Sequence, residues 1–236
     1  MQIVVDLAAT GPLNLGTYTT AQVLAVNGPS PGLPAVEPLV LAEAVRSLVA
    51  IGMAVRVEGS DELDVQGDLG VVRTIQKRSR LVVGAVFRGG RDKSPWHLVL
   101  LPQPEGVTLL GEVDALGLHQ FTAVQTAAAR KRLEDALPEG KAAEPDDGVP
   151  VAEQVERADE SASVSVVSFS ESGAEATVQL LALRAGVSLR VLQHSGDRDW
   201  RDLKVDRVGM LKVVDDLVGP ALTMPKPPFP AGRALT

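Results

Sequence analysis

The sequence predicts an α+β fold, a quasi-twofold protein with a central antiparallel β-sheet made of two β-meander-plus-helix repeats and flanked by helices. Strand-like segments between residues 80 and 113 recur between 163 and 205, and each series ends in a helical segment. A Pro-rich, acidic stretch separates the two series. Two half-covered meanders bury most apolar area when they join into one sheet, which is why we expect a single sheet.

The first half, residues 1–137, contains an early helix over residues 38–52. Leu41, Val45 and Leu48 follow one another at spacings of four and three, so they share one helical face. A glycine at the end, Gly52, fits a C-terminal cap. The sequence therefore predicts a helix that packs through one aliphatic stripe.

A shorter helix is expected from Asp68, which could cap it, and strands follow it. The turns GRDKSP and PQPEG separate three strand-like segments, over residues 80–88, 96–102 and 106–113. Strong helix formers over 122–137 predict the closing helix, with Thr122 and Gln125 in capping-box spacing.

The second half, residues 163–218, repeats this order after a linker over residues 138–162. The linker is rich in Pro and acidic residues and has no aromatic residue, so it buries little area to offset ordering entropy. Four strands are expected, over residues 163–170, 176–184, 187–193 and 200–205. A helix over 207–218 closes this half, and a Pro-rich tail over 219–236 is expected to be extended.

The composition indicates a single domain over residues 1–236 and excludes several classes of function. A net charge of -7 argues against binding to nucleic acid or to an anionic membrane surface. The absence of cysteine excludes disulfides and thiolate sites. The first residues lack the basic region of a secretory signal, and no apolar run is long enough to span a bilayer, so we expect no membrane insertion and a cytoplasmic location.

No motif predicts a catalytic, cofactor-binding or metal-binding residue. The three histidines, His97, His119 and His194, lie in or beside predicted strands without a second ligand at metal spacing. Neither a G-x-S-x-G elbow nor a phosphate-binding loop is present. We therefore assign no catalytic, cofactor or metal site, expect no enzyme activity, and leave the contact residues for a partner unknown.

One cluster of acids keeps an enzyme hypothesis open. Asp197, Asp199 and Asp202 flank Trp200, and a tryptophan beside acids can form part of a sugar or cation site. The simpler interpretation is a solvated turn with Trp200 packed over the sheet or the closing helix, and we favour it. An active site between the halves would use Asp197, Asp199 or His194.

Four stretches resemble the type VII (ESX) secretion-associated EspG chaperones of actinobacteria. AEAVRSLVAIGMAVRVEGSDELDVQGDL is similar to their early helix, glycine turn and short second helix, and RLVVGAVFRGG through RKRLEDALP is similar to their first repeat. The low-complexity linker follows where theirs does. DRDWRDLKVDRVGMLKVVDDLV resembles their C-terminal signature, with Trp200 at the position of its tryptophan. The resemblance covers residues 38–218; the first 37 residues and the tail have no counterpart.

The resemblance implies a non-enzymatic cytosolic chaperone or adaptor in protein transport. Its partner would be a secreted helical heterodimer of the PE-PPE or WXG type, docked against the sheet and the adjacent helices. No contact residue can be carried over. The alternative hypothesis is a duplicated structural or oligomeric interaction module, including a homodimer, whose unpaired strand edges associate.

Overall fold

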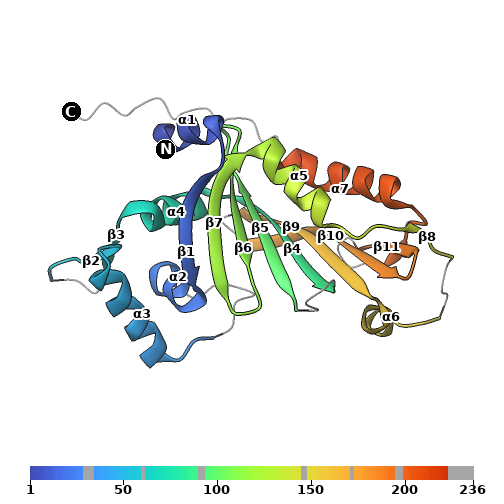
Figure 1. Ribbon diagram of the computed structural model, residues 1–236, viewed down its shortest axis with the longest axis horizontal. Helices are drawn as coiled ribbons and strands as arrows, with labels where there is room; N and C mark the ends of the chain where they lie inside the picture. Colours follow the sequence, from blue (N-terminus) through green and yellow to red (C-terminus); the bar gives the residue numbers. More distant parts are fainter. Residues whose placement is uncertain are drawn as a thin grey trace.

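The computed structural model describes residues 1–28, 35–59, 62–89, 94–144, 148–170, 173–194 and 199–222. It confirms an α+β fold in which helices flank a large antiparallel sheet (Figure 1). Among the described residues, none of the helices combines the length and apolarity that a bilayer span requires.

The main sheet has ten strands within the described residues, in the order β1-β7-β6-β5-β4-β9-β10-β11-β12, with β8 paired to β11. Among the strand pairs of the described residues, β8–β11 alone is parallel. The strands are β1 (Leu13–Thr19), β4 (Leu81–Gly89), β5 (Trp96–Pro102), β6 (Val107–Val113), β7 (Leu118–Gln125), β8 (Lys141–Ala142), β9 (Glu160–Ser170), β10 (Gly173–Ala185), β11 (Ser188–His194) and β12 (Arg201–Asp202). A separate hairpin pairs β2 (Ala54–Arg56) with β3 (Leu63–Val65).

Seven helices lie in the described part of the chain and cover the sheet on both faces. They are α1 (Gln2–Thr10), α2 (Thr20–Asn27), α3 (Pro38–Ala50), α4 (Gly67–Arg78), α5 (Thr126–Ala136), α6 (Val151–Arg157) and α7 (Arg207–Leu222). Helices α5 and α7 lie together along one side of the sheet, and α2, α3 and α6 lie on the other side in this view (Figure 1).

The two meanders join in one continuous sheet, as expected. β4 pairs with β9 along its whole length, from Leu81 opposite Ser168 to Gly89 opposite Glu160. From this central pair the strands follow chain order outward on the second side (β10, β11, β12) and on the first (β5, β6, β7). The quasi-twofold relation between the halves stays a prediction.

Three apolar clusters hold the helices to the sheet. The largest lies under α5 and α7, where Leu133 and Met210 pack over alternate residues of the central strands, such as Ala85 and Val164. The second lies on the opposite face, where α1, α2, α3 and α4 pack over β1, β5, β6 and β7. The third is small and places α6 over β10 and β11. Each strand therefore buries its alternate residues on different faces.

The early helix ends as its sequence predicts. Gly52 has a φ of 73° and its amide donates to the carbonyl of Val49, while the Met53 amide donates to Leu48. These two bonds are the Schellman arrangement, which satisfies the last carbonyls of α3. Asp68 lies inside the first turn of α4, not at its cap, which is Gln66.

The helix expected over residues 122–137 begins later, at Thr126. The interpretation of Thr122 and Gln125 as a capping box is wrong, because both lie in β7. This segment pairs with β6 on one side and with β1, about a hundred residues earlier, on the other. The distant partner overrides the local helix propensity.

The expected linker over 138–162 contains regular structure. Lys141 and Ala142 extend the sheet as β8, because the Lys141 amide donates to the Val187 carbonyl and the Ala143 amide to that of Leu189. Helix α6 then packs over the sheet through Val151 and Val155.

The Pro-rich tail also differs from its expectation at its start, because α7 continues through Pro220 to Leu222. Ala221 and Leu222 are buried in the large cluster, and this burial stabilises the last turn. The rest of the tail, residues 223–236, lies outside the described residues. The first 37 residues supply α1, β1 and α2, which the sequence patterns did not predict.

Candidate partner-binding surface

The face of the sheet opposite α5 and α7 has a central strip that no described helix covers. On one side of the strip stand the helices of the second cluster, and on the other stands α6. Its residues come from β4, β9 and the neighbouring strands and point away from the large core. We define the strip by Gly84, Val86, Val113, Ser163, Ser165 and Val167, which belong to none of the three clusters of the described residues.

Strand register brings the strip together. Gly84 lies opposite Ser165 and Val86 opposite Ser163 across the β4–β9 pair, and Val82 lies opposite Val167. The side chains of Val86, Ser163 and Ser165 are half-buried, in contrast to Ala85 and Val164 on the other face, which are buried. The floor of the strip is therefore made of small or β-branched side chains without a charge.

Small side chains let another chain approach the sheet closely. A Cβ placed on Gly84 would lie 3.4 Å from the Ser165 hydroxyl oxygen, an ordinary contact distance. The exposed His97 lies between Val86 and Val113 in one cross-strand row of the strip, and toward the other end Phe169 has 41% of its surface exposed. The strip thus has an apolar and hydroxyl floor with a polar end, which suits a protein surface.

The sequence did not identify the strip, although one signal is visible in it. In SVSVV the residues Ser163 and Ser165 alternate with Val164 and Val166, and the valines are the buried ones. Alternation shows that β9 has two unlike faces. It cannot show which face a helix covers, because α5 and α7 are distant from β9 in sequence.

A cleft of about 760 Å3 opens on another side, where the end of α5 meets the ends of β4 and β10. Its ionisable lining residues balance one another: Arg88, Asp135, Glu139, Lys141, Glu160 and Arg184. Arg184 is already paired with Glu160, with 2.7 Å between Nη2 and Oε1. The mixed charge favours neither an anionic nor a cationic ligand.

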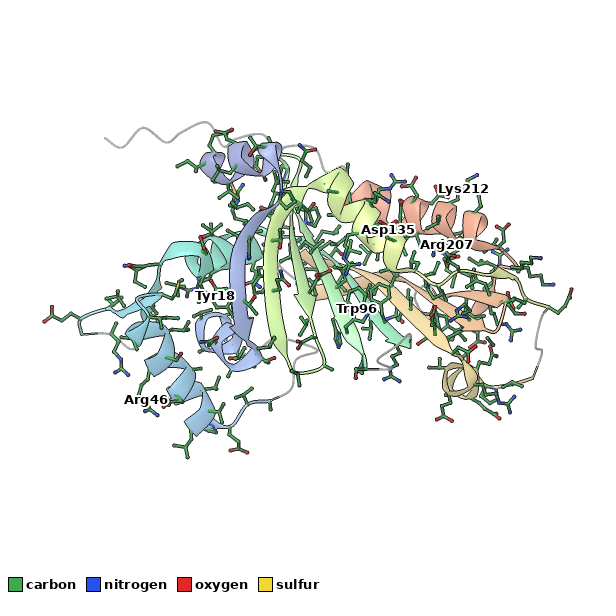
Figure 2. The ribbon with its side chains drawn as sticks, in the orientation of Figure 1. Tyr18, Arg46, Trp96, Asp135, Arg207 and Lys212 are labelled. Carbon is green, nitrogen blue, oxygen red and sulfur yellow. The ribbon has the colours of Figure 1, made fainter. Side chains whose placement is uncertain are left out.

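Trp96, at the start of β5 (Figure 2), lines the same cleft. Neighbouring side chains hold its ring in place. Its ring stacks on Phe87 with 4.3 Å between centroids, and the Arg132 guanidinium lies 5.1 Å from the ring centroid. A tryptophan fixed in this way supports the fold. The cleft therefore lacks a free aromatic platform at Trp96.

The residues of the enzyme hypothesis do not converge in the cleft. Asp199 is exposed, and Asp202 accepts a 2.8 Å hydrogen bond from Arg190 Nε. Trp200 packs on the small third cluster beneath α6, with its ring 5.3 Å from that of His194. This is packing over the sheet, as we favoured, but not against the closing helix. Asp197 lies outside the described residues.

The three histidines differ in burial and in their contacts. His119 is buried on β7, and its Nε2 lies 3.0 Å from the Thr20 hydroxyl, which itself donates to the Gly117 carbonyl. His97 is exposed on β5 and His194 is half-buried on β11. The described residues contain no group of three or more His, Asp or Glu side chains placed to hold a metal ion.

His119 makes folding depend on pH. Burial lowers its pKa, His97 lowers it further, and Asp114 opposes the change. The unfolded chain therefore binds the proton more readily, so stability falls as the pH falls below the ordinary histidine pKa of about 6.5. We expect His119→Gln to flatten this loss. Urea unfolding of the wild-type and variant proteins at neutral and mildly acidic pH measures how far the free energy of unfolding falls. An equal fall in both proteins would contradict the assignment of this pH dependence to His119.

The sheet edges are poorly suited to association with another sheet. Along β11, the outer edge is occupied by β8 and β12. At the other end, β1 is interrupted by an irregularity after Asn14, whose side chain accepts from the Gly16 amide. Bulged and covered edges oppose strand pairing between copies.

No protein-family model matches the chain, and no curated protein sequence matches it. The EspG resemblance therefore rests on the sequence patterns alone.

Proposed function

We propose that this protein is a cytosolic, non-enzymatic chaperone or adaptor that binds a secreted helical heterodimer of the PE-PPE or WXG type for type VII secretion. The observation that carries the proposal is the uncovered strip on the sheet. It offers an uncharged floor between two helical walls, whereas the cleft elsewhere has a lining of balanced charge. The EspG resemblance supplies the class of partner.

The physical basis is removal of apolar surface from water. A helix laid along the strip would cover Val86, Val113 and Val167, and the transfer contributes ~25 cal/mol for each Å2 of apolar area before the cost of association. Stable complexes bury about 800 Å2 on each partner, so the contact must extend beyond the strip onto α6 or the helices of the second cluster.

Co-purification tests the proposal. The chain is co-expressed with helical PE-PPE or WXG-type pairs from the same genome, and we expect one pair to elute with it at fixed stoichiometry. Ser165→Arg places a long charged side chain on the floor of the strip and should weaken binding by roughly a hundredfold, since a desolvated unpaired charge costs several kcal/mol.

Ser188→Arg is the matched control. Ser188 is an exposed serine at the β10–β11 turn, outside the strip, so the same change there should leave binding unaltered. Melting curves of both variants establish that the sheet is intact. Binding that survives Ser165→Arg would remove the strip as the docking surface, and failure of every such pair to co-purify would refute the chaperone function.

A further inference from the structure

Helix α3 is apolar on two opposite faces. One face packs inward through Ala44 and Leu48, which are both buried. The outward face carries Leu39 and Val49, with 81% and 39% of their surfaces exposed. A helix that is apolar on both sides is normally covered on both sides.

The outward residues form a regular stripe. Leu39, Ala42, Arg46 and Val49 follow at spacings of three, four and three, which is the pattern of a helix-pairing seam. All four are exposed, and Glu43 lies beside them on the same face. Arg46 projects from α3 on the side away from the sheet (Figure 2). Ala42 leaves room for a second helix at the usual separation of 8–10 Å.

Exposed apolar side chains are frequent on α3 and in the segment after it. Fourteen large hydrophobic residues of the described chain are exposed, and six of them belong to α3 and the segment that follows it: Leu39, Val40, Val49, Ile51, Val55 and Val57. Of the other eight, three lie on or beside α1 (Met1, Ile3 and Leu7), and five lie elsewhere in the described chain. Such a concentration marks an interaction surface.

The stripe is complementary to itself. When two α3 helices pack antiparallel about a twofold axis between Ala44 and Val45, Glu43 lies opposite Arg46 of the partner subunit, and this pair occurs twice. Leu39 then lies opposite the partner's Ala50, filling the space beside the small residue. Within one chain Arg46 Nη2 is 2.6 Å from Glu43 Oε2, and both side chains are more than half exposed. Each charged group can therefore leave this pair and bind the opposite charge on the second copy.

We propose that two copies of this chain associate through the outward face of α3, packed antiparallel about a twofold axis. The association is isologous, because each copy presents the same stripe. It involves neither the sheet edges nor the strip, so the strip stays open, and the rest of the partner contact would fall on α6 or on the helices of the second cluster other than α3.

Charge reversal tests the proposal on the full chain. Light scattering coupled to size exclusion should show a concentration-dependent dimer of the wild-type protein. Glu43→Arg places an arginine opposite Arg46 of the partner subunit in both of the twofold-related contacts. Arg46→Glu likewise places a glutamate opposite Glu43 of the partner subunit. We expect each single change to raise the dimer dissociation constant roughly tenfold or more, because two like-charge contacts replace two ion pairs.

The double variant E43R/R46E decides the geometry, since it restores opposite charges across the axis and should restore the dimer. The control is K131E on α5, which breaks a comparable exposed i,i+4 ion pair with Asp135 and should leave the dimer unchanged. Val49→Asp provides a second disruption that does not depend on the ion pair. A wild-type protein that stays monomeric at all concentrations overturns the proposal, as does a double variant no stronger than the singles.

Discussion

Replacing Arg207 by alanine is expected to lower the free energy of unfolding by about 3 kcal/mol. Its guanidinium donates to the Glu134 carbonyl at 2.7 Å, to the Pro138 carbonyl at 2.8 Å and to the Leu137 carbonyl. Glu134 lies in the last turn of α5, and Leu137 and Pro138 follow the helix directly, so the guanidinium lies at the negative end of the helix dipole. One side chain at the start of α7 thus satisfies the end of α5 and joins the closing helices of both halves.

Urea unfolding followed by circular dichroism measures this loss. Arg130→Ala is the control, because Arg130 also connects the two helices, through Asp215 at 2.7 Å, but in an exposed pair. We expect the control to lose less than about 1 kcal/mol. Equal losses in the two variants would show that the carbonyl contacts of Arg207 are exchanged for water without cost.

Gly89→Ala is expected to be at least as damaging, because it acts where the two meanders meet. A Cβ on Gly89 would lie 2.2 Å from the Asp159 carbonyl oxygen and 2.8 Å from the Glu160 Cα, both backbone atoms. Its φ of 102° adds backbone strain. The end of β4 must separate from β9, and we expect a loss of about 3 kcal/mol or more.

Gly106→Ala isolates the backbone contribution. Gly106 has a φ of 78° and nothing lies within 4 Å of its Cβ position, so only strain of about 1 kcal/mol applies. Thermal or urea unfolding of the two variants gives the difference. A Gly89→Ala protein as stable as Gly106→Ala would mean that the β4–β9 junction adapts freely.

Local patterns in the sequence were sufficient where a segment's neighbours in the chain determine its structure. The cap at Gly52 and the helix from Gly67 follow from a few adjacent residues, and the strands of the meanders follow from alternation and turns. The successive antiparallel strands β4 to β6 and β9 to β11 are joined by short connections, so they need no distant information to pair in order.

Segments whose partners are distant were predicted wrongly or missed. Residues 118–125 form a strand because β1 supplies a second edge, and helix α6 is ordered because Leu181, Leu183 and Leu192 lie beneath Val151 and Val155. Nothing in either segment encodes these contacts. The strip was missed for the same reason, since an uncovered face is defined by where other helices lie.

The stripe on α3, in contrast, could have been predicted from its own local sequence. PLVLAEAVRSLVA has apolar residues at two sets of helical positions, and the interpretation through Leu41, Val45 and Leu48 used only the inward set. Leu48 is fully buried while Leu41 and Val45 are half-buried, so that the inward prediction is confirmed in part. Counting the remaining apolar positions would have indicated the second face.

Site-specific photocrosslinking in the native host tests the central claim most directly. A photoreactive residue at position 165 lies on the floor of the strip, and one at position 212 replaces Lys212 on α7, on the other side of the sheet (Figure 2). We predict a discrete adduct with a helical secreted protein from position 165 and none from position 212. Equal labelling at both positions, or an adduct at 212 alone, would contradict the account.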